Sequence, residues 1–135
     1  MQTTDRTQTS QTSGQTLLTG AIAQYFATLN AQDYAQTATL FASDGILHPP
    51  FESDIVGPEA IAQYLQTEAT GMQLQPRQIE EQGDRTYHVT GKVKTSLFTV
   101  NVAWFFVLNP HDQIASVTVK LIASPQELLK LRSRT

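Results

Sequence analysis

The chain has 135 residues, a formal net charge of -3 and no cysteine, with a sequence pI near 5.5. This length suits one domain with a single hydrophobic core. The nine Lys and Arg residues are scattered, so the sequence lacks the basic stripe that nucleic-acid binding requires, and we expect no nucleic-acid partner. The absence of cysteine excludes disulfides, a thiol nucleophile and thiolate zinc sites.

The N-terminal segment has a different composition from the rest of the chain. Residues 1–16 are almost all Thr, Gln and Ser, and such a segment buries too little apolar surface to offset its conformational entropy. We therefore expect a disordered tail over residues 1–16 and one folded domain over residues 17–132. The sequence shows neither the pattern of a signal peptide nor an apolar run of roughly 20 residues, which favours a cytoplasmic protein.

Two helices are predicted at the start of the domain. Apolar residues at helical spacing predict a first helix over residues 17–30. Asp33 can cap a second, short helix that carries Leu40 and Phe41 and ends at an Asp-Gly turn, residues 44–45.

A third helix and several strands follow. Residues 55–56 predict a short strand, and Pro58 at the first helical position opens a helix through Ala69. After residue 71 apolar residues alternate with polar ones, and two long runs, 97–108 and 114–122, are joined by an Asn-Pro-His-Asp turn. We expect both faces of the first run to be covered, since one carries Val100, Val102, Trp104, Phe106 and Leu108 and the other Ala103, Phe105 and Val107.

This order of elements predicts an α+β fold. Three N-terminal helices should close one face of a curved antiparallel sheet, which gives a cone with an interior cavity. A short C-terminal helix is expected from Ser124, because Pro follows the Ser cap and Glu127 stands three residues after it, as in a capping box.

Several short motifs, in one order along residues 20–132, are similar to a known family. The sequence resembles the C-terminal domain of the orange carotenoid protein and its stand-alone homologues from oxygenic photosynthetic bacteria, which have the NTF2-like cone fold. The motifs are residues 25–30 (YFATLN), 40–45 (LFASDG), 49–51 (PPF), 55–57 (IVG), 89–93 (VTGKV), 103–104 (AW), 108–110 (LNP), 121–125 (LIASP) and 127–129 (ELL).

The resemblance implies a cofactor and two residues that hold it. In the family a keto-carotenoid occupies a tunnel, and its ring carbonyl accepts hydrogen bonds from a Tyr phenol and a Trp indole. Tyr25 and Trp104 stand at the matching positions. Both side chains combine a large apolar body with one donor that needs a partner when buried. The implied ligand is canthaxanthin, echinenone or 3'-hydroxyechinenone.

The resemblance also implies a mainly apolar tunnel wall. Each carbonyl hydrogen bond contributes about 1 kcal/mol, so most affinity should come from burying the polyene, at about 25 cal/mol per Å². Ala69 stands where the family often has Cys, and Leu97 where it has an aromatic residue, so we expect no thiol control and a wider mouth. The implied wall residues are Leu29, Ala69, Met72, Leu74, Thr95, Leu97, Phe98, Val102 and Phe106.

Size suggests partners. A domain of this length has a radius of gyration of about 14 Å, so an extended carotenoid is nearly as long as the domain is wide. We therefore expect a homodimer that shares one carotenoid and shields its apolar surface. The resemblance adds a helical carotenoid protein as donor or acceptor of pigment, and a transient membrane contact for uptake. Because light-driven quenching in the family needs a helical domain, the expected function is to carry, store or deliver pigment in support of photoprotection.

Two other functions stay open. Without the resemblance, Tyr25 and Trp104 would be read as core residues. Related cones host isomerases and dehydratases, which use a cavity acid or imidazole, and the inward face of the 97–108 run offers neither, so we expect no enzyme. A purely structural dimerisation module is the third reading.

The remaining polar residues carry no strong signal. Glu68, near the end of the third helix, is interpreted as a surface residue. His48, His88 and His111 show no metal-ligand spacing, so no metal site is expected.

Overall fold

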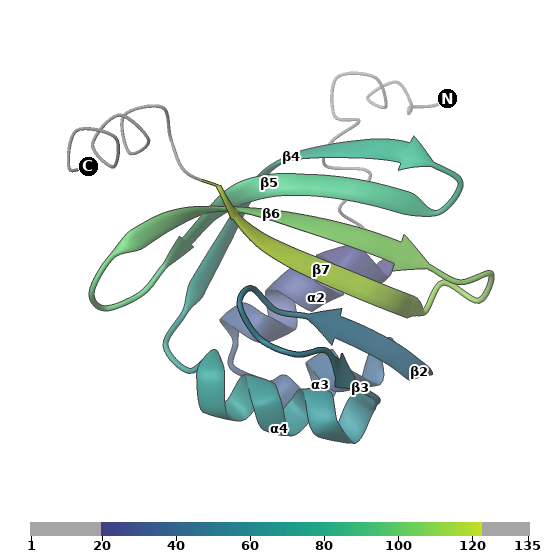
Figure 1. The fold of residues 1–135 in the computed structure, drawn as a ribbon, viewed down its shortest axis with the longest axis horizontal. Helices are drawn as coiled ribbons and strands as arrows, with labels where there is room; N and C mark the ends of the chain where they lie inside the picture. The colour runs from purple at the N-terminus through teal and green to yellow at the C-terminus, as the bar shows by residue number, and fades with distance from the viewer. Residues whose placement is uncertain (1–19, 123–135) are drawn as a thin grey trace, which may run out of the picture.

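Three helices lie on one side of a curved six-stranded sheet in the computed structural model, which describes residues 20–122 (Figure 1). The predicted tail, the start of the first helix and the C-terminal helix from Ser124 lie outside these residues. In chain order the elements are α2 (Gly20–Asn30), α3 (Tyr34–Thr39), β2 (Phe41–His48), β3 (Ile55–Val56), α4 (Pro58–Glu68), β4 (Gln73–Gly83), β5 (Thr86–Lys94), β6 (Thr99–Leu108) and β7 (Ile114–Ile122).

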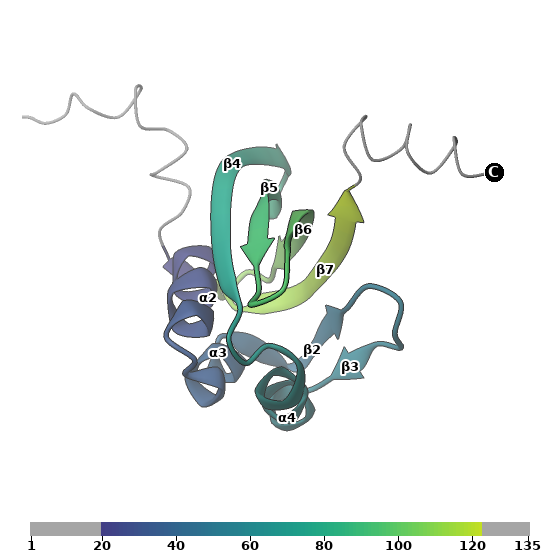
Figure 2. The same cartoon turned by 90° about the vertical axis from the view of Figure 1, so that its left-hand side faces the viewer.

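The sheet has the strand order β3-β2-β7-β6-β5-β4. Figure 2 shows the long strands β4 to β7 curving over the helices, which confirms the predicted α+β cone. The expectation of an antiparallel sheet needs one correction, because β2 pairs with β7 in parallel while every other neighbouring pair is antiparallel. The sheet is therefore mixed, and β2 enters it directly after α2 and α3, before α4.

Strand β2 replaces two predicted features. Phe41, expected at the end of a helix, begins the strand and pairs with Ile114. The Asp-Gly pair expected to form a turn lies inside the same strand, at a register shift between Phe41 and Ile46. A Cβ on Gly45 would lie 2.9 Å from the Ile114 carbonyl oxygen, so glycine is needed here for close approach of two strands.

The predicted start signals of α3 and α4 are confirmed, whereas α3 ends at Thr39, earlier than predicted. The Asp33 side chain accepts a hydrogen bond from the Gln36 backbone N at 3.3 Å and caps α3. Pro58 opens α4, and Ala69 is its C-cap. None of the helices within residues 20–122 is long and apolar enough to cross a membrane.

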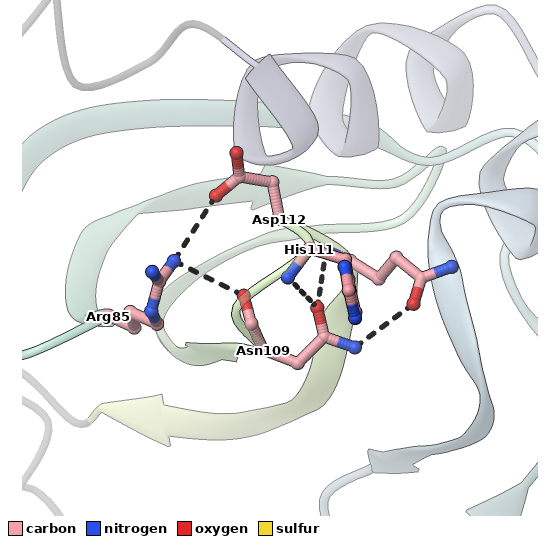
Figure 3. A network of polar contacts seen from close by, with 5 residues as sticks. Arg85, Asn109, His111 and Asp112 are labelled. Atoms are coloured by element: carbon pink, nitrogen blue, oxygen red, sulfur yellow. Dashed lines mark hydrogen bonds and ion pairs between the residues drawn. The ribbon is translucent and has the colours of Figure 1, made fainter.

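The predicted turn between the last two strands is confirmed (Figure 3). Asn109 Oδ1 accepts from the backbone N of His111 at 2.9 Å and of Gln113 at 3.0 Å. Arg85, from the neighbouring hairpin, donates to the Asn109 carbonyl oxygen at 3.3 Å and to Asp112 at 3.5 Å. These contacts tie together the two hairpin turns at the end of the sheet opposite the loop between β5 and β6 (Figure 1).

The core fills the space between the helices and the concave face of the sheet. Trp104, Phe106 and Val102, from the inward face of β6, are each about 1 % exposed. The opposite face of β6 was predicted to be covered as well. Among the described residues this cover is incomplete, since Ala103 is buried but Val107 is 38 % exposed.

Candidate ligand cavity

A cavity of about 290 Å³ lies between the helices and the sheet. Its lining comes from every layer of the fold and is overwhelmingly apolar. The lining residues are Tyr25, Leu29, Leu47, Pro49, Pro50, Glu52, Tyr64, Leu65, Glu68, Ala69, Met72, Leu74, Val93, Thr95, Phe98, Val100, Val102, Trp104, Val119 and Leu121.

The two ends of this lining differ in exposure to water. Tyr25 and Trp104 are 2 % and 1 % exposed and mark what we call the closed end. Phe98 and Leu121 are 56 % and 46 % exposed and, with the exposed Glu52 and Glu68, mark what we call the mouth. The lining side chains are therefore buried at the closed end and exposed to solvent at the mouth.

Aromatic packing holds the closed end. The Phe26 ring lies edge-on to both Tyr25 and Trp104, with centroids 5.3 and 4.8 Å apart. Phe106 packs edge-on against Tyr25 at 5.1 Å. Such T-shaped pairs are favourable beyond the area they bury. The ring positions of Tyr25 and Trp104 are therefore set by the core itself.

The polar atoms of these two residues have no hydrogen-bond partner among the residues that the structure describes. Neither the Tyr25 hydroxyl nor the Trp104 indole N–H makes a hydrogen bond to any of residues 20–122, although buried donors in proteins are nearly always bonded. Burial raises the pKa of Tyr25 well above its ordinary value, and the nearby Tyr64 phenol adds to this effect. Tyr25 is thus a neutral donor at physiological pH, and the closed end holds two donors that no residue of the described range 20–122 engages.

A second phenol, that of Tyr64, lies nearer the mouth. Tyr64 donates a hydrogen bond to Glu52 Oε2 at 3.3 Å. Burial, then the Glu52 charge and this hydrogen bond, and finally the Glu68 charge raise the pKa of Tyr64 to about 12. The Tyr64 hydroxyl therefore keeps its proton and donates it in a hydrogen bond to Glu52.

One side-chain clamp positions the wall where α2 meets β4. Asn30 Nδ2 donates to the Leu74 carbonyl oxygen at 2.9 Å, and Asn30 Oδ1 accepts from the Leu74 backbone N at 2.7 Å. This pair satisfies both backbone groups of Leu74 and holds its buried side chain against the cavity.

The residues proposed from sequence fall into two groups. Leu97 lies outside the lining and is 85 % exposed, at the tip of a loop that the Thr95 N to Phe98 O hydrogen bond closes. Phe106 also lies outside the lining, buried behind Tyr25. The structure brings the others together around the cavity: Tyr25, Leu29, Ala69, Met72, Leu74, Thr95, Phe98, Val102 and Trp104.

Sequence reasoning missed part of the lining. Tyr64, Leu65 and Glu68 share the inward stripe of α4, so helical spacing could have found them. Val93, Val119 and Leu121 occupy alternating positions of strands that were predicted. Leu47, Pro49, Pro50 and Glu52 lie in or just after β2, which was not predicted as a strand. Glu68, interpreted as a surface residue, is exposed but also lines the mouth.

The histidines do not gather at the cavity. His48 Nδ1 lies 2.6 Å from Asp54, His88 stacks on Phe105, and His111 belongs to the turn of Figure 3. Within residues 20–122 no cluster of three or more His, Asp or Glu side chains could hold a metal ion.

Comparison with known proteins gives a family and several relatives. The model of the SnoaL-like domain family matches residues 22–117. Orange carotenoid-binding proteins of Limnospira maxima and Synechocystis are each 40 % identical, over 82 % and 80 % of this chain. The chain spans 37 % of the length of these two relatives.

Solved structures give the same likeness. The orange carotenoid protein of Anabaena (Nostoc), solved binding canthaxanthin, has a TM-score of 0.69 and 38 % identity over 82 % of this chain and 38 % of its own. An epoxide hydrolase/cyclase-like enzyme of pyran ring formation in salinomycin has a TM-score of 0.68. Its identity is 18 %, over 79 % of this chain and 90 % of its own, so this likeness concerns the fold alone.

Proposed function

We propose a function from the premise that this chain belongs to the SnoaL-like domain family, with the NTF2-like fold, and is homologous to orange carotenoid proteins. The chain binds one end of a keto-carotenoid in its cavity. The observation that carries this proposal is the pair of buried, unpartnered donors, Tyr25 and Trp104, at the closed end of an apolar cavity within the described residues.

The ligand chemistry matches the two kinds of surface. A ring carbonyl accepts from the Tyr25 hydroxyl and the Trp104 indole N–H, which relieves the cost of two buried donors without a partner. The polyene then lies along the apolar wall, where each Å² removed from water contributes about 25 cal/mol. Canthaxanthin, echinenone and 3'-hydroxyechinenone all combine a ring carbonyl with a long polyene.

The exposed mouth sets the partners. A cavity of about 290 Å³ encloses only part of an extended carotenoid, so the rest leaves past Phe98 and Leu121. A second copy of the chain covers this apolar remainder in a homodimer that shares one pigment. Exchange with a helical carotenoid protein, and transient contact with a membrane for uptake, give the chain its role: to carry, store or deliver carotenoid in support of photoprotection.

Expression in cells that make canthaxanthin or echinenone tests binding. We expect coloured protein with the mass of a dimer on a native column, and an absorption band that is broader and red-shifted relative to free pigment. The Tyr25→Phe, Trp104→Phe double variant should shift the band back. Tyr87→Phe is the matched control, because it removes a phenol hydroxyl from a residue that packs on the core outside the cavity.

Colourless wild-type protein would overturn the proposal. A coloured monomer would overturn the shared-pigment dimer while leaving carotenoid binding intact. Mixing the coloured protein with a colourless helical carotenoid protein tests delivery, since transfer should move the colour to the partner's elution volume.

An enzyme is the second candidate function. The observation that favours it is a pair of carboxylates, Glu52 and Glu68, on the cavity lining of a fold that enzymes share. Both carboxylates are exposed, and Glu52 is engaged by Tyr64, whereas acid–base chemistry needs a shielded group beside the substrate. Colourless protein that turns over a small apolar substrate, with loss of turnover in Glu52→Gln, would favour this function over the carrier.

A further inference from the structure

The charged residues that line the cavity within residues 20–122 all have one sign. Glu52 and Glu68 line the mouth, and no Lys, Arg or His within residues 20–122 belongs to the lining. Lys120 stands between the lining residues Val119 and Leu121, but its Nζ lies 5.7 Å from the Phe105 ring centroid, on the opposite face of the sheet. The part of the lining that the structure describes is therefore apolar and uncharged at the closed end and carries two negative charges at the mouth.

An apolar cavity of this size could hold fatty acids or other lipid carboxylates as readily as a polyene with a neutral end. We propose that Glu52 and Glu68 bias the cavity towards neutral polyene carbonyls and weaken the binding of ligands that end in a carboxylate. The inference rests on the proposed function and names the chemical feature by which that function selects its ligand.

A carboxylate cannot be accommodated at the closed end. Tyr25 and Trp104 could donate one hydrogen bond each to it, but the described lining offers no cation there. Removing an ionised carboxylate from water costs more than two neutral donors return. A carbonyl carries no net charge, so it gains the same two donors without that penalty.

A carboxylate is also disfavoured at the mouth. A lipid acid that inserted its tail first would leave its head group beside Glu52 and Glu68. Tyr64 cannot compensate as a donor, because its hydroxyl already donates to Glu52 Oε2 at 3.3 Å. Repulsion between exposed like charges is moderate and is screened by salt. We expect a factor of about five in affinity, which corresponds to about 1 kcal/mol.

Two ligands that differ only at the polar end provide the test. All-trans-retinal ends in a carbonyl and all-trans-retinoic acid in a carboxylate, and both are polyenes. The chain has one tryptophan, Trp104, which lines the cavity, so quenching of its fluorescence reports occupancy. Titrations at low ionic strength should show retinal binding at least about tenfold more tightly than retinoic acid to wild type.

The double variant Glu52→Gln, Glu68→Gln isolates the two charges, and the new amide oxygen at position 52 can still accept the Tyr64 hydrogen bond. Retinoic acid should bind this variant about fivefold more tightly than wild type, with retinal changed by less than about twofold. The control Glu81→Gln, Asp84→Asn changes the net charge by the same amount, at exposed positions in and beside the hairpin turn between β4 and β5. It should leave the affinities for retinal and for retinoic acid unchanged.

The outcomes separate the two proposals. Equal affinity of wild type for retinal and retinoic acid, or an unchanged retinoic acid affinity in Glu52→Gln, Glu68→Gln, overturns the charge filter and leaves carbonyl binding standing. Failure of both ligands to quench Trp104 overturns the proposed function and the filter with it. An equal gain in the Glu81→Gln, Asp84→Asn control would assign the effect to net charge and also overturn the filter.

Discussion

The closed end and the mouth of the cavity use apolar side chains in different ways. At the closed end Tyr25, Phe26 and Trp104 are interlocked edge to face and nearly inaccessible to water. At the mouth Phe98 is more than half exposed and belongs to a loop tip. The first region stabilises the fold and fixes the positions of two donors, whereas Phe98 packs little against the other described residues, which suits the ligand contact proposed for it.

Phe106→Ala should give the largest change in stability. The ring is 1 % exposed and packs against Tyr25 at 5.1 Å, so its removal leaves a cavity in the core. We expect a loss of about 3–5 kcal/mol in the free energy of unfolding, measured by urea denaturation. A loss below about 1 kcal/mol would show that the closed end is not the structural centre of the fold.

Asn30→Ala should come next. The substitution removes both hydrogen bonds to the backbone of Leu74, at 2.9 and 2.7 Å, and leaves those groups without partners. We expect a loss of about 2 kcal/mol, again by denaturation. Asn30→Gln provides a comparison for the Ala variant, since its longer side chain keeps an amide group but moves it out of position for the two hydrogen bonds to Leu74. Full stability of the Ala variant would mean that the clamp does not position the wall.

Alkaline pH should weaken the closed end. Burial raises the pKa of Tyr25, so in the folded chain it keeps its proton at pH values where the unfolded chain, with a tyrosine pKa of about 10, loses it. The unfolded state then binds fewer protons, and stability falls above about pH 10 by about 1.4 kcal/mol per pH unit from this group. Denaturation between about pH 9 and about pH 11 should show a shallower fall in Tyr25→Phe; identical slopes would contradict a buried phenol.

Phe98→Ala should have the smallest effect on stability. The side chain is 56 % exposed, so we expect a change within about 0.5 kcal/mol. The substitution should instead increase the rate at which the coloured protein loses pigment to lipid vesicles. Strong destabilisation without a change in the rate of pigment loss would reverse the roles assigned to the two regions.

The same contrast explains what the sequence could predict. Local sequence signals predicted the start of α4 from Pro58 and the N-cap of α3 from Asp33, and they predicted Trp104 on the inward face of β6. They failed at β2, because Gly45 there permits a close approach to Ile114, a residue far away in the chain, while Asp-Gly locally indicates a turn.

The candidate-site residues show the same limit of local sequence signals. Tyr25 and Trp104 were found through the family resemblance, and the structure places both at the closed end of the cavity. Glu52 was missed because it follows the unpredicted strand β2. Phe106, predicted as a wall residue, lies outside the lining, because alternation identifies the inward face of β6 but cannot show that the ring packs against Tyr25 instead of lining the cavity.

The carbonyl stretching frequency of bound canthaxanthin tests the central claim most directly. In wild type we predict a frequency below that of free pigment, because Tyr25 and Trp104 both donate to the oxygen, and a partial return in Tyr25→Phe and in Trp104→Phe. The Tyr87→Phe control should match wild type. A bound pigment whose carbonyl frequency equals that of free pigment, and is indifferent to both substitutions, would contradict carbonyl binding at the closed end.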